Sequence, residues 1–549
     1  MAVTKKPAPA PKKHCRTVTK TVKGKKKRVR VCTTKAPVKK KPLTTVKPAP
    51  TFVLAPEVPA KVPPAPQLPP SSVTPVDPTP PDPTPPDPTP PDPGPDTPQL
   101  VTSPLTAAQA ERLLWRAGFG PRPGQVAAFT GRDPAEAIQA LTRPGSVSFS
   151  GAAGTDDNGF AFQPTINWGH DHCAWLDRMV RCDQPMIERI ALIFHDWFGV
   201  SRGEVEPYWI LPHIQMYRDQ GFGSFDQLLK NVAKDPAMLL FLNGIENTKN
   251  NPNENFAREV MELFTLGAER NAYTETDIRE LAKALTGWRA TWDTNAGDWR
   301  NFRFDPTRHV NGNKTIFGQT DNFSWDDGVG VKDVFPLLLN HPLHASFFCT
   351  KMWSYFVPVP PDSATLANLT GIYLAHNREI RPVIEAILQH PQCLNGPKMV
   401  IPPVVQAAGI LRATGGRLRT DNWAWVGDMA GQRLFWPPNV SGWDDQRWLD
   451  TSKLRGRWYQ AVYALDHNYL DPWSGPSYDP NETAQAALTS ALEFVGNPTI
   501  TEEARAALLA FSNGIEALAV NSWQKSPYKA MRQNALRMLI LTSPDRNVC

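Results

Sequence analysis

Apolar side chains recur at helical spacing along most of the chain from Ser103 onward. Met186, Ile190 and Ile193 follow one another at intervals of four and three residues, which is the pattern of an amphipathic helix. Ser, Thr and Asn residues precede several such runs and can accept hydrogen bonds from the first helical amides. The pattern predicts helices over the ranges 106–118, 183–198, 224–232, 253–264, 274–287, 344–357, 364–375, 380–390, 399–413, 423–434, 452–466, 483–495 and 501–520.

Alternation typical of strands is scarce and is limited to short stretches at 299–304 and 314–317. Long segments without periodicity lie at 145–170, 288–335 and 435–450. The sequence therefore predicts a mainly α fold, a large multi-helical globular domain with long irregular loops. We expect a helical domain over 105–465 and a C-terminal helical extension over 466–549 that packs on the same body.

The first hundred residues differ from the rest in composition. They hold 27 of the 57 prolines, and three TPPDP units follow one another between Thr79 and Pro93. Proline at this density enforces polyproline II, which rises roughly 3.1 Å per residue. Residues 43–104 are therefore predicted to form an extended Pro-rich linker, and residues 1–42 a disordered basic tail.

Charge is divided unevenly between tail and body, although the whole chain has a net charge of +6. Residues 1–50 contain 14 Lys, 3 Arg and no acidic residue, which leaves 42 basic and 53 acidic residues and a net charge of −11 for the rest. The tail is expected to attach to an anionic polymer or a cell-envelope surface. The acidic body argues against nucleic acid as a partner. The sequence has no apolar run of 18 residues, so we expect no transmembrane helix.

Five segments carry more specific patterns. They are Asn253–Gly267 (NENFAREVMELFTLG), Ala282–Trp288 (AKALTGW), Phe304–His309 (FDPTRH) followed by Lys314–Gly318 (KTIFG), Lys351–Phe356 (KMWSYF) and Phe435–Trp443 (FWPPNVSGW). In this order and spacing they resemble the bacterial DUF1800 family, over about residues 105–465. The family often has two histidines in a WHNHF-like motif, whereas this chain has FHDWF over 194–198, with Trp197 in place of the second histidine.

The resemblance implies an exported protein, often with a sulfatase-like partner from the DUF1501 family, and it implies no particular reaction. We therefore expect an extracellular or cell-envelope location. The basic residues of Met1–Lys13 have no apolar stretch behind them, so a secretory signal would require a start upstream of Met1.

The NENFAREVMELFTLG segment places charges among apolar positions. Glu259 and Glu262 are three residues apart and therefore neighbours on one helix face, and Arg258 can pair with Glu262. One interpretation is a salt bridge on the helix surface. The other is acid–base catalysis of the kind used in glycoside hydrolysis, in which a second carboxylate assists the proton donor. That second carboxylate could also come from Asp305 or Asp277.

Asp305 and His309 lie in a loop rich in turn-forming residues, with Lys314 nearby. Such a loop either lines a site or is held together by hydrogen bonds to Asp305. The predicted helix over 253–264 has no ExxH pair, and the HDHC sequence over 170–173 lacks the second half of a zinc motif. We therefore predict no metal and no other cofactor. Three cysteine pairs could form disulfides: Cys15–Cys32, Cys173–Cys182 and Cys349–Cys393.

Tryptophan is abundant, with 18 residues in the chain and six of them between Trp423 and Trp458. Core packing explains part of this cluster. The remainder resembles a sugar-binding surface, because aromatic faces pack against pyranose C–H groups while neighbouring carboxylates bind hydroxyls. The residues predicted to bind substrate are Arg258, Lys314, Trp436, Asn439 and Trp443.

Together these patterns favour an exported or surface-tethered helical protein that binds or hydrolyses an envelope or extracellular glycan. If it is an enzyme, it is expected to be a hydrolase that uses carboxylate acid–base chemistry. The predicted catalytic residues are Glu259, Glu262, Asp305 and His309. The alternative is a non-catalytic cell-envelope assembly protein, which predicts that Arg258 and Lys314 neutralise the carboxylates and that an apolar patch lies elsewhere.

Overall fold

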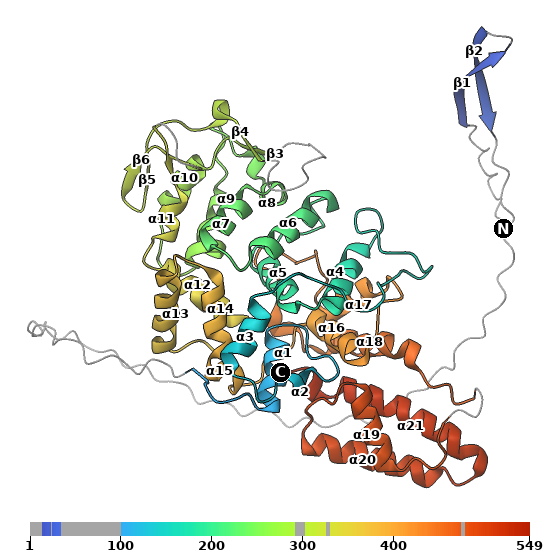
Figure 1. The fold of residues 1–549 in the computed structure, drawn as a ribbon. Coiled ribbons are helices and arrows are strands. Elements are labelled where there is room, and N and C mark those ends of the chain that lie inside the picture. Colours follow the sequence, from blue (N-terminus) through green and yellow to red (C-terminus); the bar gives the residue numbers. More distant parts are fainter. Residues whose placement is uncertain (1–13, 23–24, 34–99, 291–301, 326–329, 474–477) are drawn as a thin grey trace, which may run out of the picture. The chain divides into compact units, whose positions relative to one another are not determined.

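The computed structural model describes residues 14–22, 25–33, 100–290, 302–325, 330–473 and 478–549. The chain divides into two units, Met1–Thr89 and Pro90–Cys549, and Figure 1 labels their helices and strands where there is room. Helices hold 57% of the described residues and strands 7%, which confirms the predicted mainly α fold. The predicted linker lies outside the described residues up to residue 99.

The first unit contains an antiparallel hairpin formed by β1 (His14–Val22) and β2 (Lys25–Thr33). Its register places Cys15 opposite Cys32 and Val18 opposite Val29. The alternating Thr and Val residues of these two ranges favour strand pairing, and the predicted disorder of residues 1–42 stays a prediction. Elsewhere in 1–42 the prediction concerns residues outside the described ranges.

The second unit begins with α1 (Ala107–Arg116), which is capped by reciprocal hydrogen bonds between Thr106 and Gln109. The helices that follow are α2 (Gln125–Phe129), α3 (Pro134–Thr142), α4 (His170–Arg181), α5 (Pro185–Trp197), α6 (Pro207–Gln220), α7 (Phe225–Lys234) and α8 (Pro236–Phe241). Most of α5 is buried, as its apolar periodicity predicts, and α5 packs against α4 and α6.

The middle of the unit combines short helices with small two-stranded sheets. Its elements are η1 (Gly244–Glu246), α9 (Glu254–Glu259), the π-helix η2 (Val260–Leu266), α10 (Glu275–Ala284), β3 (Trp288–Ala290), β4 (Phe302–Phe304), η4 (Pro306–Arg308), β5 (Lys314–Ile316), β6 (Gln319–Asp321), β7 (Phe323–Ser324) and β8 (Lys332–Asp333). Strands β3–β4 and β5–β6 pair antiparallel, and β7–β8 pair parallel. The strand stretch predicted at 314–317 is confirmed by β5, and the part of 299–304 that is described contains β4.

A second helical region follows. It consists of α11 (Phe335–Leu339), α12 (His344–Ser354), α13 (Ser363–Ala375), α14 (Ile380–Gln389), α15 (Pro391–Leu394), α16 (Pro403–Thr414), α17 (Trp423–Ala430), η5 (Asp445–Arg447), α18 (Thr451–Leu465) and η6 (Asp466–Asn468). Among these, α16 is buried along nearly its whole length and contacts both α4 and α18. The segment between α17 and α18 contains no long helix, in agreement with the irregular stretch predicted at 435–450.

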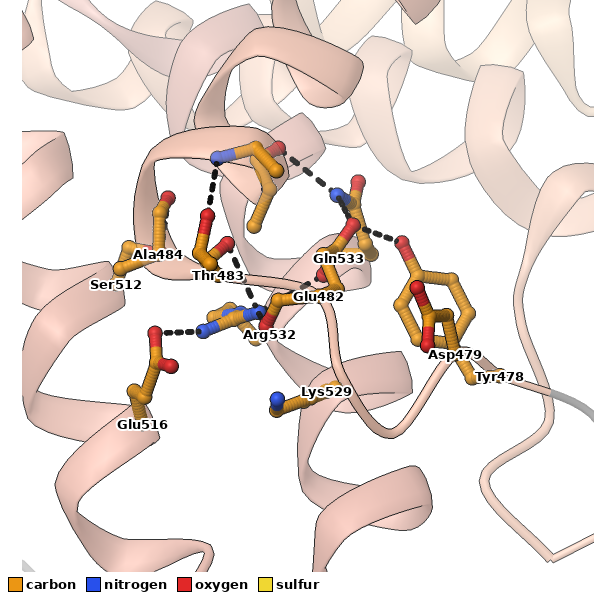
Figure 2. A network of polar contacts seen from close by, with 12 residues as sticks. Tyr478, Asp479, Glu482, Thr483, Ala484, Ser512, Glu516, Lys529, Arg532 and Gln533 are labelled. Carbon is orange, nitrogen blue, oxygen red and sulfur yellow. Dashed lines mark hydrogen bonds and ion pairs between the residues drawn. The ribbon is translucent and has the colours of Figure 1, made fainter.

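The last helices, α19 (Ala484–Phe494), α20 (Glu502–Leu518) and α21 (Ser522–Thr542), pack against one another and are followed by η7 (Pro544–Arg546). Figure 2 shows the polar network that joins them. The side chain of Arg532 is 0% exposed and donates to Glu482 Oε2 at 2.9 Å and to Glu516 Oε2 at 3.3 Å. Tyr478 and Gln533 donate to the other carboxyl oxygen of Glu482. This network ties all three helices to the 478–483 segment.

The end of the chain lies against α1 and the segment that precedes α16. Met399 and Cys549 exchange two backbone hydrogen bonds, of 2.8 and 2.9 Å, and Arg116 donates to the carbonyl of Cys549. Helix α21 also contacts α18. Within the described ranges, no helix combines the length and the apolar character needed to cross a bilayer.

Candidate functional site

Helix α5 carries two charged side chains into the wall of one small cavity. Arg189 and Asp196 are seven residues apart, which is about two helical turns, so both lie on the same side of α5. Both line a cavity of about 140 Å³, which we call the Asp196 cavity. Its lining residues include Arg189, Asp196, Lys351, Tyr355, Gln432, Trp443, Asp445 and Trp448.

The loop over 435–443 lies directly on the C-terminal end of α5. The backbone amide of Trp443 donates to Asp196 Oδ1 at 2.8 Å. Gly442 has a φ of +90°, and a Cβ there would collide with both the carboxylate and the carbonyl of Asp196. A Cβ on Gly199 would meet the carbonyl of Asn439 at 2.8 Å. Both glycines therefore allow the loop to approach closely enough to hold the carboxylate.

Helix α12 supplies the opposite wall of the Asp196 cavity. The hydroxyl of Tyr355, the C-cap residue of α12, donates to Asp196 Oδ2 at 2.8 Å. One turn earlier, the Lys351 ammonium lies 5.3 Å from the centre of the Tyr355 ring. Each oxygen of Asp196 thus accepts one hydrogen bond, and because a carboxyl oxygen has two lone pairs, each keeps one site for a proton or a ligand.

Two buried donors of the cavity have no acceptor. Arg189 is 4% exposed, and its Nε has no hydrogen-bond partner among the described residues. The same holds for the indole Nε1 of Trp448, whose side chain is also buried. A buried donor without an acceptor is costly, so these groups favour a bound molecule that brings oxygen acceptors.

The pKa values of Asp196 and Arg189 are both shifted in this cavity. Burial raises the pKa of Asp196 above its ordinary value, and Asp445 adds to the rise, whereas Lys351, the Trp443 amide and the Tyr355 hydroxyl oppose it. Burial also lowers the pKa of Arg189 to about 10, so this group remains charged at neutral pH. A carboxyl group with a raised pKa beside two cations and a phenol is suited to proton transfer.

The predicted pair Glu259 and Glu262 lies at the junction of α9 and the π-helix. Both side chains are half-buried. Arg258 donates to Glu262 Oε1 over a long distance of 3.5 Å. It donates two shorter hydrogen bonds, of 2.8 and 2.7 Å, to the carboxylate of Glu275. Burial raises the pKa of Glu259, and the Glu262 carboxylate raises it further. Arg258 is therefore chiefly a partner of Glu275, a residue that the sequence analysis did not single out.

We expect Glu259→Gln to leave the melting temperature unchanged or slightly higher at neutral pH. Because the pKa of Glu259 is raised on folding, the folded state disfavours its charge, and the stability of the wild type falls as pH rises through that pKa. Glutamine removes this cost. The check is thermal unfolding beside Glu275→Gln, which leaves Arg258 without its main partner. A Glu259→Gln variant that melts earlier than Glu275→Gln would show that Glu259 has a salt-bridge role.

Asp305, His309 and Lys314 form a second group. Asp305 caps η4 by accepting from the amide and hydroxyl of Thr307, at 3.0 and 2.6 Å, which is the hydrogen-bonded loop considered as the structural alternative. His309 Nδ1 lies 2.9 Å from the carbonyl of Thr286, and His309 Nε2 lies 3.3 Å from the Lys314 ammonium. Besides burial, Thr286 and Lys314 shift the pKa of His309, whereas Glu262 and Arg258 shift the pKa of Glu259. Within the described residues, no recorded contact joins the two groups.

Lys314 should make stability depend on pH. Burial lowers its pKa from 10.5 to about 8, so between these values the unfolded chain binds more protons than the folded one. Stability is then expected to rise as pH increases from about 8 to about 10.5. Lys314→Met should melt at a higher temperature at pH 7 and show less of this rise. The exposed Lys525→Met serves as control, and an unchanged pH profile in Lys314→Met would contradict the assignment.

The three predicted residues of the 435–443 loop have different environments. Trp443 lines the Asp196 cavity. Trp436 lies half-buried with the Arg433 guanidinium 4.4 Å from its ring centre. Asn439 is exposed, and its side chain accepts from the amide of Ser441. Of the other clustered tryptophans, Trp423 and Trp448 are buried, and Trp425 and Trp458 are exposed.

The imidazole rings of His195, in the FHDWF segment, and of His172 accept hydrogen bonds from backbone amides. His195 Nε2 accepts from the amide of Phe435 at 3.2 Å, and His172 Nδ1 from that of Leu434 at 3.0 Å. Burial lowers the pKa of both, to about 3 for His172. Among the residues that the structure describes, no three His, Cys, Asp or Glu side chains are arranged to hold a metal ion.

Two of the suggested disulfides are wrong. Cys173, Cys182, Cys349 and Cys393 are free and buried. Cys173 lies in the first turn of α4 and Cys182 is the C-cap of that helix, so about 13 Å of helix separates them, too far for a bridge. Cys15 and Cys32 lie opposite each other in the β1–β2 hairpin, and a disulfide between them stays a prediction.

Sequence reasoning missed Arg189, Asp196, Lys351 and Tyr355. A signal was present, since the FHDWF, KMWSYF and FWPPNVSGW segments each supply at least one residue of the Asp196 cavity. Their meeting at one cavity depends on tertiary contacts between α5, α12 and the 435–443 loop.

The fold and the site define a mainly helical protein with a half-buried carboxyl group at a small cavity lined by charged and aromatic side chains. A family model described as "Protein of unknown function (DUF1800)" matches residues 112–548. The chain therefore belongs to the DUF1800 family, and the match extends beyond the segment over 105–465 that carries the motifs. Comparisons with curated proteins and with solved structures find no significant match.

Proposed function

We propose that this protein binds and hydrolyses an envelope or extracellular glycan, with the Asp196 cavity as its catalytic centre. The observation that carries this proposal is the carboxyl group of Asp196, whose pKa is raised and which lies beside two buried donors that lack acceptors. Sugar hydroxyl and ring oxygens are acceptors of the required kind. Trp443 and Trp448 offer the aromatic contacts that saccharides use.

In this proposal Asp196 is the general acid. Its raised pKa favours the protonated form, which can donate to the leaving glycosidic oxygen. Asp445 lines the same cavity and would be the second carboxylate, acting as base or nucleophile. Arg189 and Lys351 would bind hydroxyl or acidic groups of the sugar. Glu259 and Glu262, together with Asp305 and His309, remain the alternative catalytic group, with Arg258 and Lys314 beside them.

The experiment is a binding screen of the full chain against envelope polysaccharide fragments at about 0.5 M salt, where charge attraction to the tail is screened. Lys351→Met is expected to weaken binding of the recognised fragment about tenfold or more, because a charged hydrogen bond is lost. Lys525→Met, on the exposed side of α21, is the matched control. Equal affinities in the two variants would place the glycan site outside the Asp196 cavity.

The basic tail would hold the protein at its site of action. Its positive charges act without any acidic residue in 1–50, which favours attachment to an anionic envelope polymer, and the resemblance to exported proteins favours an extracellular or envelope location. Both statements belong to this proposal.

A second candidate function is that of a cell-envelope assembly protein, with a DUF1501 partner as the family resemblance implies. Two observations favour it. Arg258 lies 3.5 Å from the carboxylate of Glu262, and α17 and α18 expose an apolar surface that includes Trp425 at 42% and Trp458 at 51% exposure. Such patches commonly bind proteins. Failure of every glycan to bind the wild type would favour this function.

A further inference from the structure

A second cavity, of about 540 Å³, is lined by an unusual number of positive side chains. We call it the arginine cavity. Its basic lining residues are Arg122, Arg181, Arg412, Arg417, Arg419 and His467. It lies where the C-terminal end of α4 meets the end of α16, the loop that follows α16, and η6. It shares no lining residue with the Asp196 cavity.

Two of these arginines have a structural task. Arg122 donates to the carbonyls of residues 180, 181 and 182 at 2.8 to 3.2 Å, and Arg412 donates to those of 179, 180 and 182 at 3.1 to 3.4 Å. These carbonyls end α4, where a helix carries partial negative charge. Burial, together with the charge of Arg122, lowers the pKa of Arg412 to about 9. The α4 carbonyls therefore position two guanidinium groups without neutralising them.

The other arginines lack a comparable arrangement. Arg181 pairs with Asp177 at 2.9 Å. Arg417 and Arg419, on the loop after α16, have no recorded hydrogen bond or ion pair among the described residues, and the Nε of Arg417 is buried without a partner. Five arginines thus line one cavity, and among the described residues only Arg181 has a carboxylate partner there. Arg122 is close enough to lower the pKa of Arg412, and positive charges that share a cavity repel one another, so the arrangement favours a bound anion.

We propose that the arginine cavity binds a compact organic ligand that carries at least two sulfate or phosphate ester groups. Guanidinium groups bind these oxyanions through paired hydrogen bonds, and several arginines are needed to neutralise more than one ester. The volume lies in the range of small-ligand sites. Leu411 and Tyr463 give the cavity an apolar wall for the body of the ligand. This proposal stands whether or not the Asp196 cavity is catalytic.

Thermal unfolding of the full chain separates ligand binding at this cavity from binding at the tail. A ligand that binds the folded body raises its melting temperature, and the tail is identical in all variants compared. The sulfate probe is a heparin tetrasaccharide, the phosphate probe is inositol hexakisphosphate, and neutral maltotetraose is the uncharged control. The test variant is Arg417→Gln/Arg419→Gln. The matched control is Arg505→Gln on α20, where Arg505 is exposed and makes only a long ion pair of 3.9 Å with Glu502.

We expect at least one charged probe to raise the melting temperature of the wild type and of Arg505→Gln. In the double variant the dissociation constant should increase about 100-fold, roughly tenfold for each lost charged hydrogen bond, and the shift should largely disappear. The probe whose stabilising effect disappears in the double variant shows whether the cavity prefers sulfate or phosphate esters. An equal shift in the double variant, or an equal shift with maltotetraose, would overturn the proposal. A double variant that melts earlier without ligand would assign the two arginines a structural role and would also contradict it.

Discussion

Asp196→Asn is expected to lower turnover of the recognised glycan by about 100-fold or more while the protein stays folded. Loss of a general acid typically removes a factor of this size or larger from the rate. Asparagine keeps the shape of the side chain, and the Tyr355 hydroxyl can turn to accept from the new amide. Because burial raises the pKa of Asp196, the folded wild type disfavours its charge, so wild-type stability falls as pH rises through that pKa. The variant should therefore melt at the same temperature or higher.

The measurements are the steady-state rate on the fragment found by screening and the melting temperature as a function of pH. Asp444→Asn is the control, because Asp444 is exposed and sits beside Asp445 outside the lining of the Asp196 cavity. Retention of ligand binding with loss of turnover supports the role of proton donor. Full turnover in Asp196→Asn would move the chemistry to another group, and the pair Glu259 and Glu262 would be tested next.

Arg532→Met is expected to cost about 3 kcal/mol of stability, because it breaks a buried ion pair and leaves Glu482 charged in the interior. The Arg532 side chain is 0% exposed, and that of Glu482 is 9% exposed. Tyr478 and Gln533 still donate to Glu482, so the loss should stop short of complete unfolding (Figure 2). Chemical denaturation of the full chain measures the effect.

Arg532→Met/Glu482→Gln should recover part of that loss, since it removes the unpaired charge. Arg505→Met on the exposed face of α20 is the control and should stay within about 0.5 kcal/mol of the wild type. If Arg532→Met were as stable as Arg505→Met, the network in Figure 2 would contribute little to holding α19, α20 and α21 together.

Whether a helix could be predicted from the sequence depended on whether its buried face is apolar or, as in this network, polar. Helices such as α5 and α14 have an apolar face that packs on the core, and their periodicity was sufficient to locate them. Helix α21 was missed although it spans 21 residues. It buries Lys529, Arg532 and Gln533 in polar contacts, so charged residues stand where the pattern required apolar ones. Pro527 within the helix obscured it further.

The site was predictable only in part, for a related reason. Charges among apolar positions drew attention to Glu259 and Glu262, and the same argument applies to Asp196 between buried His195 and Trp197. What distinguishes Asp196 is contact with Tyr355 and Trp443, which are 159 and 247 residues away in the chain. Periodicity and spacing report local neighbours, so they could identify each segment but not the cavity that the segments share.

A π-helix accommodates an additional residue relative to an α-helix of the same length, and the hydroxyl of Thr265 donates to the carbonyl of Val260, five residues earlier. If the same residues formed an α-helix instead, the additional residue would advance the winding by one position. Every later side chain would then turn by about 100° around the axis. Phe264 and Leu266, both fully buried, would rotate out of the core. The number of residues in this segment, as well as their chemical type, therefore determines which side chains face the interior.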